Sequence, residues 1–374
     1  MDLFVTGTTG FVGRYLAIRL LGRPGEHRLR CLVRADNAEH GHQRLRDSIG
    51  RLIDGEALDA VMARVDAVVG DLTKPNLGLS DADRASVLQD CDTFLHAAAD
   101  VRFNQPLQDA RDRNVAGTRR VAELARASAE AGKLKRLDWV GTAFVAGLRR
   151  DLVAEGDLEH DAGWKNSYEQ SKYEAELLLH EEFGDLPLTV FRPSIVVGES
   201  SSGSTSNFGM LYWPVQLYAR GWWRTVVGRK DTPVDLVPVD FVADAIEALS
   251  RPDQPTGGRY HLCAGPDGNR TIGQLATLVE SYFDGGGARY MDPDTFNRWV
   301  RPFVDLFMHG RRGKVLKSGG RFFIEYMKGN PIFDITESSR ALAALGVELP
   351  TVEDYFGTLL DYAVQTDWGR KPAA

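Results

Sequence analysis

The first structural signal in this chain is a glycine-rich stretch near the amino terminus, Val5-Thr6-Gly7-Thr8-Thr9-Gly10-Phe11-Val12-Gly13-Arg14. It follows a short apolar run that is typical of a buried parallel strand, and helical spacing of apolar residues follows it over 11–21. In a strand–turn–helix unit, Gly7 permits a tight turn, Gly10 lets the backbone approach a pyrophosphate, and Gly13 lets the helix pack closely on the strand. The free N–H groups of the helix N-terminus then face the phosphates. The motif therefore predicts a dinucleotide-binding site.

Strand and helix patterns alternate after this motif. Apolar runs predict further strands at 28–34, 67–71, 93–96, 137–140 and 188–191, the fifth strand of the chain (137–140) being less apolar than the others. Helical segments separate them, for example 113–129 and 167–183. Such alternation implies a parallel sheet that is covered on both faces. We therefore expect an α/β fold, a Rossmann-type doubly wound parallel sheet with a smaller, mostly helical C-terminal substrate domain.

The end of the second strand indicates which dinucleotide is bound. An acidic residue there would hydrogen-bond the ribose 2′-hydroxyl of NAD. This strand ends at Val33-Arg34, and Asp36 comes two residues later. Arg34 and Arg14 can instead pair with a 2′-phosphate. The sequence favours NADP(H), the alternative being that both arginines are solvated surface charges.

A tyrosine, a lysine and a threonine form the predicted catalytic set. Tyr168 and Lys172 are four residues apart in a helical segment, so they lie on one face, one turn apart. A nearby ammonium is expected to lower the pKa of Tyr168, which can then exchange a proton with a substrate oxygen. Thr142 follows the fifth strand, where its hydroxyl can hydrogen-bond the same oxygen. The Tyr–Lys spacing alone is typical of a solvated helix face, but its place after the glycine motif and a strand-end Thr predicts catalysis.

Several further stretches carry a family resemblance. Besides the glycine motif, Tyr168 and Lys172, they are 31–35 (Cys-Leu-Val-Arg-Ala), 70–79 (Gly-Asp-Leu-Thr-Lys-Pro-Asn-Leu-Gly-Leu), 95–104 (Leu-His-Ala-Ala-Ala-Asp-Val-Arg-Phe-Asn), 114–118 (Asn-Val-Ala-Gly-Thr) and 192–196 (Arg-Pro-Ser-Ile-Val). With these residues the chain resembles the extended short-chain dehydrogenase/reductases. Within them it is most similar to the branch of fatty acyl-CoA reductases and of the thioester reductase domains of carboxylic acid reductases and nonribosomal peptide synthetases. The match covers residues 1 to about 200 and weakens beyond them.

The resemblance implies a role for each matching residue. It makes Thr142, Tyr168 and Lys172 the catalytic triad. It implies that the cofactor is bound by Thr6, Gly7, Thr9, Gly10, Phe11, Val12, Gly13, Arg14, Arg34, Asp71, Leu72, Ala97, Ala98, Ala99, Tyr168, Lys172, Pro193, Ser194, Ile195 and Val196, with Asp71 and Leu72 by the adenine and 193–196 by the nicotinamide. Asn114 is expected to hold a water or a backbone carbonyl, or to cap a helix. The chain departs from the family at Gly141, where a serine often precedes the catalytic threonine.

The implied reaction is NADPH-dependent reduction of an acyl thioester, bound to coenzyme A or to an acyl or peptidyl carrier protein. Its product is an aldehyde, and a second hydride would give the alcohol. One alternative is a dehydrogenase, epimerase or dehydratase that acts on a nucleotide sugar or another alcohol, because the same triad serves those reactions. Another alternative is a non-catalytic sensor that binds NADP(H) and a partner protein.

Composition limits the class of protein. The 374 residues are 43% hydrophobic and 26% charged, which is ordinary for a folded protein. A net charge of −7 argues against nucleic acid as a partner, and three scattered cysteines argue against a disulfide scaffold or a zinc site. The amino terminus lacks the pattern of a signal peptide, and no apolar stretch has the length of a membrane-spanning helix. We expect a cytoplasmic protein without a metal. The sequence is compatible with peripheral contact with a membrane.

The expected domain division follows from the change in sequence pattern after residue ~198, where the regular alternation of strands and helices gives way to a Ser- and Gly-rich segment. Residues 1–200, with 230–265 contributing, are predicted to form the NADP(H)-binding domain, and 201–229 with 266–374 the substrate domain. The aromatic run 207–223 predicts either a wall for an acyl chain or ordinary packing. The segment 298–328 has eight basic and two acidic residues among several aromatic ones. It predicts a surface for an acidic carrier protein, for coenzyme A phosphates or for an anionic membrane, or a solvated face.

Overall fold

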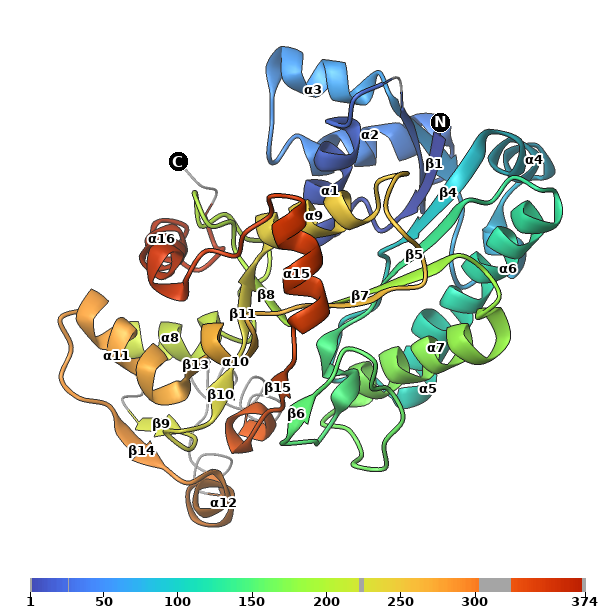
Figure 1. The fold of residues 1–374 in the computed structure, drawn as a ribbon. Helices are drawn as coiled ribbons and strands as arrows, with labels where there is room; N and C mark the ends of the chain where they lie inside the picture. Colours follow the sequence, from blue (N-terminus) through green and yellow to red (C-terminus); the bar gives the residue numbers. More distant parts are fainter. Residues whose placement is uncertain (1, 26, 222–224, 303–323, 372–374) are drawn as a thin grey trace.

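A parallel sheet forms the centre of the molecule. The computed structural model describes residues 2–25, 27–221, 225–302 and 324–371. The sheet has seven strands in the order β12-β7-β5-β4-β1-β2-β3, and every neighbouring pair is parallel (Figure 1). Its strands are β1 (Asp2–Thr6), β2 (Arg28–Val33), β3 (Val65–Val69), β4 (Cys91–His96), β5 (Arg136–Val140), β7 (Leu188–Pro193) and β12 (Arg259–Leu262). The expected doubly wound parallel sheet is confirmed.

Helices cover both faces of this sheet, because successive side chains of a strand point to opposite sides. Leu3 and Val5 of β1 belong to one buried cluster, and Phe4 belongs to the cluster on the other face. The first cluster is covered by α1 (Phe11–Leu21), α2 (Ala38–Ile49), α3 (Gly55–Met62), α9 (Val239–Leu249) and α15 (Thr336–Ala344). The second is covered by α4 (Asp81–Asp90), α6 (Ala116–Glu130) and α7 (Ser167–Phe183). Burial on both faces explains why central strands such as β1 and β7 are largely apolar runs.

The fifth strand of the sequence, β5, is buried although it contains two charged residues. All five of its residues are buried. Arg136 pairs with Asp138 at 3.1 Å and also donates to the Thr189 hydroxyl and to the Leu249 carbonyl. A buried charge is tolerated when it is paired and its remaining donors are satisfied. This network explains why β5 is central in the fold but less apolar in the sequence.

A third buried cluster lies beside the carboxyl ends of the strands, and its helices are on the left of Figure 1. Its helices are α8 (Tyr212–Ala219), α11 (Ile272–Tyr282) and α16 (Val352–Gln365), and residues 324–328 are also helical. Short strand pairs connect it: β6 (Leu152–Val153) with β15 (Ile332–Phe333), β8 (Ile195–Val197) with β11 (Leu236–Pro238), β9 (Thr225–Val227) with β14 (Arg289–Met291), and β10 (Pro233–Val234) with β13 (Arg270–Thr271). Single helical turns are η1 (Pro75–Gly78), α5 (Leu107–Ala110), η2 (Arg111–Val115), η3 (Ala143–Ala146), α10 (Gly265–Gly268), α12 (Pro293–Thr295) and η4 (Phe296–Val300). The domain division stays a prediction, and α15, which it places in the substrate domain, packs with the cluster of α1 and α9.

The aromatic run of the sequence lies partly in the third cluster. Tyr212 is 2% exposed there, and its hydroxyl accepts a hydrogen bond from the Gly198 N–H at 3.1 Å. The Phe208 ring stacks on Tyr362, with centroids 6.4 Å apart. These contacts favour packing as the role of the two rings. Residues 222–224, with two of the tryptophans, lie outside the described residues.

Only the ends of the basic segment fall within the described residues, since 303–323 lie outside them. Lys328 pairs with Glu325 at 3.0 Å and with Asp294 at 3.4 Å. Arg298 lies over the exposed Trp299 ring at 5.3 Å. In the part of the chain that the structure describes, no helix combines the length and the apolar character needed to cross a bilayer.

Candidate active site

The glycine motif forms a turn in which three backbone segments meet. Gly7 has a φ of +87°, and its carbonyl accepts a hydrogen bond from the Gly10 N–H at 2.8 Å. A Cβ on Gly7 would lie 2.6 Å from the Ala98 nitrogen, and a Cβ on Gly13 would lie 2.0 Å from the Gly7 oxygen. The turn, helix α1 and the segment after β4 can therefore approach one another only without these side chains.

This turn fits the pyrophosphate of a dinucleotide. Gly10 precedes α1 and no side chain caps the helix, so the first N–H groups of α1 remain for a ligand. Thr9 and Gly10 are exposed. The turn also lies between β1 and β4, where the strand order of the sheet reverses, and ligands of open α/β sheets bind at such a point.

The residues after β4 are hydrogen-bonded to the end of β1. The Ala97 N–H donates to the Thr6 carbonyl at 3.2 Å, and the Ala98 N–H donates to the Thr6 hydroxyl at 3.2 Å. The same hydroxyl lies 2.6 Å from Nδ1 of His96. The structure thus brings Thr6, Ala97 and Ala98 together beside the glycine turn, and Ala99 follows them in the chain.

The two arginines expected at a 2′-phosphate differ in their surroundings. Arg34 follows β2, is exposed, and has no ion-pair partner among the residues described. Arg14 is 7% exposed, and its guanidinium donates to the Gly10 carbonyl and to the Ser206 hydroxyl at 3.2 and 3.4 Å. The guanidinium of Arg34 is therefore accessible for the expected ion pair with a 2′-phosphate. The guanidinium of Arg14 is instead hydrogen-bonded to the glycine turn and to the loop at 199–207.

The remaining predicted cofactor residues lie near the ends of β3 and β7, at the start of α1, or in β8. Asp71 follows β3, and its carboxylate accepts hydrogen bonds from Thr73, while the Leu72 carbonyl accepts one from Arg120. Ser194 follows β7 and donates to the buried Asp235 at 2.5 Å. Phe11 and Val12 begin α1, Pro193 ends β7, and Ile195 with Val196 pairs with β11.

The predicted catalytic residues meet at the ends of β5 and α7. The Thr142 hydroxyl lies 3.4 Å from the Pro193 carbonyl, and it interacts with the Tyr168 hydroxyl. Lys172 lies one turn further along α7, and its Nζ donates to the Val140 carbonyl at 2.9 Å. The same ammonium lies 4.0 Å from the centroid of the Trp139 ring. The geometry thus places a threonine, a tyrosine and a lysine at one point on the edge where the glycine turn lies.

The pKa of Tyr168 departs from the expectation. Burial raises the pKa of Tyr168 to about 12, and the hydrogen bond with Thr142 partly offsets this shift. The charge of Lys172 does not contribute to the shift. Burial also lowers the pKa of Lys172 to about 7, and the charge of Glu176 partly opposes that shift. The expected lowering of the Tyr168 pKa was wrong, because burial raises this pKa and Lys172, whose Nζ donates to the Val140 carbonyl, does not oppose the shift. The phenol therefore stays protonated at neutral pH, which is the form that can give a proton.

The buried lysine makes stability depend on pH. In the unfolded chain the amine has a pKa of ~10.4. Between pH 7 and 10 the unfolded chain therefore binds a proton that the folded protein lacks. The free energy of unfolding consequently rises with pH in this window. We expect Lys172→Met to lose this dependence. Without cofactor, its Tm relative to wild type should be higher at pH 7 than at pH 10, by on the order of 5 °C.

Differential scanning calorimetry at both pH values measures this difference. Lys133→Met, at an exposed position, is the matched control and should keep a constant Tm difference. A constant difference for Lys172→Met as well would mean that the buried amine does not titrate as described.

Asn114 holds a backbone segment rather than a helix end. Its side chain accepts from the Asp100 N–H at 2.8 Å and donates to the Asp100 carbonyl at 3.0 Å. It also donates to the Ser171 hydroxyl at 2.9 Å, next to Lys172. Of the roles expected for it, holding a backbone carbonyl is the one that the structure shows.

Two aromatic residues beside Tyr168 were not singled out from the sequence. The Phe103 ring lies 5.7 Å from the Tyr168 ring and 6.0 Å from that of Tyr326. The Tyr326 hydroxyl donates to the buried Glu169 at 2.6 Å. Phe103 lies in a stretch that carries the family resemblance, but Tyr326 is 158 positions after Tyr168 by numbering, and no local pattern marks it.

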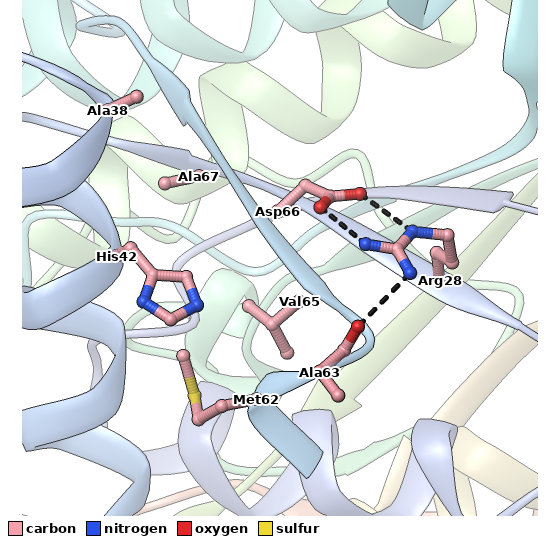
Figure 2. Close-up of a pocket in the computed structure, with 8 residues that line it drawn as sticks. All are labelled: Arg28, Ala38, His42, Met62, Ala63, Val65, Asp66 and Ala67. Carbon is pink, nitrogen blue, oxygen red and sulfur yellow. Dashed lines mark hydrogen bonds and ion pairs between the residues drawn. The ribbon is translucent and has the colours of Figure 1, made fainter. Parts of the chain in front are cut away.

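A cavity of about 390 Å³ lies at the opposite end of the sheet (Figure 2). It is lined by Arg28, His42, Met62 and Asp66, among others, near the start of β2 and β3. The Arg28 guanidinium donates to both oxygens of Asp66 at 2.6 and 2.9 Å, so its charge is already paired. Since ligands bind at the carboxyl ends of such strands, this cavity is not the candidate site.

Comparisons with known proteins identify the family of the chain. The family described as "Male sterility protein", an NAD-binding family, matches residues 5–246. The nonribosomal peptide synthetase asaC of Aspergillus flavus is 30% identical over 70% of this chain, and the fatty acyl-CoA reductase wat of Drosophila melanogaster is 27% identical over 66% of it. The chain spans only 26% and 53% of these two relatives. The solved terminal R domain of the myxalamid PKS-NRPS biosynthetic pathway superposes with a TM-score of 0.81 and 26% identity, over 99% of this chain and 92% of that chain.

Proposed function

The chain belongs to the NAD-binding family described as male sterility protein, within the extended short-chain dehydrogenase/reductases, and we propose that it reduces an acyl thioester to an aldehyde with NADPH. Its cofactor is a nicotinamide dinucleotide. The observation that carries the proposal is the placement of Thr142, Tyr168 and Lys172 at the ends of β5 and α7, on the same edge of the sheet as the glycine turn. The kinship with a peptide synthetase, a fatty acyl-CoA reductase and an R domain supports a thioester as substrate.

Each residue of the triad has a task in this reaction. The bound cofactor, when reduced, supplies the hydride that reaches the carbonyl carbon. The hydroxyls of Thr142 and Tyr168 donate hydrogen bonds to the oxygen on which negative charge develops. Tyr168 then gives its proton to that oxygen, and Lys172 holds the ribose. Collapse of the resulting hemithioacetal breaks the carbon–sulfur bond and releases the aldehyde and a thiol.

The preference for NADPH is assigned to Arg34. Arg34→Ala should weaken binding of NADPH by about 10- to 100-fold and leave NADH binding unchanged, because a charge-assisted hydrogen bond to the 2′-phosphate is lost. Titration of each dinucleotide by fluorescence measures both Kd values. Arg28→Ala, at the other end of the same strand, is the matched control and should change neither. Equal losses for NADH and NADPH would contradict the assignment.

The reaction itself is tested by following NADPH oxidation and thiol release together. Acyl-CoA thioesters of different chain length, thioesters of phosphopantetheinylated carrier proteins, and nucleotide sugars form the panel, with NADH in parallel. One NADPH consumed per thiol released indicates the aldehyde as product, and two indicate the alcohol. Turnover of a nucleotide sugar without any thioester turnover would overturn the proposal in favour of a sugar-modifying dehydrogenase or epimerase.

A further inference from the structure

The ammonium of Lys172 rests on the face of a buried indole. Trp139, near the end of β5, is 1% exposed, and Nζ of Lys172 lies 4.0 Å from its ring centroid. A cation at this distance from a desolvated indole face is stabilised by the ring quadrupole. Nζ also donates to the Val140 carbonyl at 2.9 Å. Within the described ranges Lys172 has no ion-pair partner, because the carboxylate of Glu176 pairs with Arg192 at 2.5 Å.

The indole fills the space that a side chain at position 141 would occupy. A Cβ on Gly141 would lie 2.5 Å from Cζ3 of Trp139 and 3.1 Å from Cη2. Real Cβ atoms do not approach ring carbons this closely, so the indole would have to move. The indole can occupy this space because residue 141 has no side chain.

Hydrogen bonds fix the indole from its other edge. Its Nε1 donates to the Thr118 hydroxyl at 3.4 Å, and that hydroxyl lies 3.2 Å from Nε2 of His96. Nδ1 of His96 is in turn bound to Thr6, which precedes the glycine turn. Burial, followed by the charge of Lys172, lowers the pKa of His96 to about 3, so this imidazole is neutral. A buried chain of contacts thus connects Lys172 to the end of β1.

We propose that Trp139 is the positioning residue for Lys172: its indole face, given room by Gly141, holds the ammonium at the cofactor side of the site. An ammonium has three N–H donors. Val140 takes one and the indole face another, which leaves one for the ribose of the bound dinucleotide. This inference rests on the proposed function for the role of Lys172, but its tests read out binding and stability.

The ionisable groups near Lys172 decide whether the pH dependence of NADPH binding reports the charge of Lys172 or of a neighbour. Glu176, on the same helix, raises the pKa of Lys172, and it is neutralised by Arg192. His96 on β4 is neutral, and Tyr168 stays protonated below pH ~10. Between pH 6 and 9 Lys172 is therefore the group beside the indole whose charge changes.

The first test measures the Kd of NADPH from pH 6 to 9 by its fluorescence. We expect Trp139→Leu to weaken binding about tenfold at pH 7 and to move the midpoint of the pH dependence down by about one unit, because the charged amine loses its ring contact. Trp139→Phe, which keeps a smaller ring face, should restore at least half of both changes. Trp164→Leu, which removes an indole packed against Tyr173 of the same helix, is the control and should move neither. A lower Tm for Trp139→Leu and Trp139→Phe with an unmoved midpoint would show a merely structural tryptophan and overturn the proposal.

The second test is a double-mutant cycle that needs no turnover. Gly141→Ser alone should lower the Tm, since its Cβ meets the indole. In the Trp139→Leu background the same change should cost less than half as much. Equal costs in both backgrounds would overturn the pairing of the two positions. A protein that passes both tests but reduces no thioester would refute the proposed function and leave the role of Trp139 intact.

Discussion

Tyr168→Phe should reduce kcat/KM for a thioester by about 10²- to 10⁴-fold while the protein still binds NADPH. The variant keeps the ring that packs on Phe103, so the fold and the cofactor site are preserved. It loses the only atom that gives a proton to the carbonyl oxygen in the proposed reaction, and general acid catalysis contributes on this scale. NADPH oxidation with coupled thiol release measures the loss, and fluorescence titration measures cofactor binding.

A second tyrosine on the same helix provides the control for this change. Tyr173 packs on Trp164 and His160, with ring centroids 5.1 and 5.3 Å apart, and it lies outside the set formed by Thr142 and Tyr168. Tyr173→Phe should therefore retain wild-type kcat/KM. If Tyr168→Phe also retained full NADPH-dependent turnover, the proton would come from another group and the proposed mechanism would be refuted.

The sheet was predictable because its signals are local. Central strands such as β1 and β7 are buried on both faces over most of their length, so each appears in the sequence as a largely apolar run that can be found without knowing its neighbours. The helix 167–183 was predicted with the bounds that the structure shows. The glycine motif was predictable for the same reason, since Gly7, Gly10 and Gly13 all act within one turn and one helix. Even the charged β5 was found, although the Thr189 hydroxyl and the Leu249 carbonyl, which accept from its buried Arg136, come from other segments of the chain.

The electrostatics of the site were not predictable in the same way. Spacing correctly placed Tyr168 and Lys172 one turn apart, but it led to the wrong direction for the pKa of Tyr168. That direction depends on how much water each group loses, and burial is set by segments from the whole chain. Tyr326 reaches the site from beyond residue 300 and Trp139 reaches it from inside β5, so neither belongs to a recognisable motif. The sequence therefore predicts which groups meet more reliably than the charge state in which they meet.

Gly13→Ala should abolish or strongly weaken cofactor binding, although alanine favours a helix. In α1 the change would gain the ~1 kcal/mol by which alanine exceeds glycine in a helix. The added Cβ, however, would lie 2.0 Å from the Gly7 carbonyl oxygen, a backbone atom that cannot turn away as a side chain can. The turn between β1 and α1 must then open, and overpacking of this kind costs about 1–3 kcal/mol. We expect a lower Tm and a Kd for NADPH that is at least about tenfold weaker.

Gly357→Ala separates the clash from the helix propensity. Gly357 is exposed within α16, and a Cβ there would meet nothing within 4 Å, so the same substitution should raise the Tm and leave the Kd of NADPH unchanged. Both variants add one methyl group to a helix, and only the methyl group at position 13 meets backbone atoms of the glycine turn. If Gly13→Ala instead behaved like Gly357→Ala, the close approach of α1 to the turn would not be needed for binding. The motif would then act through the free N–H groups of the helix alone, because those groups remain in both variants.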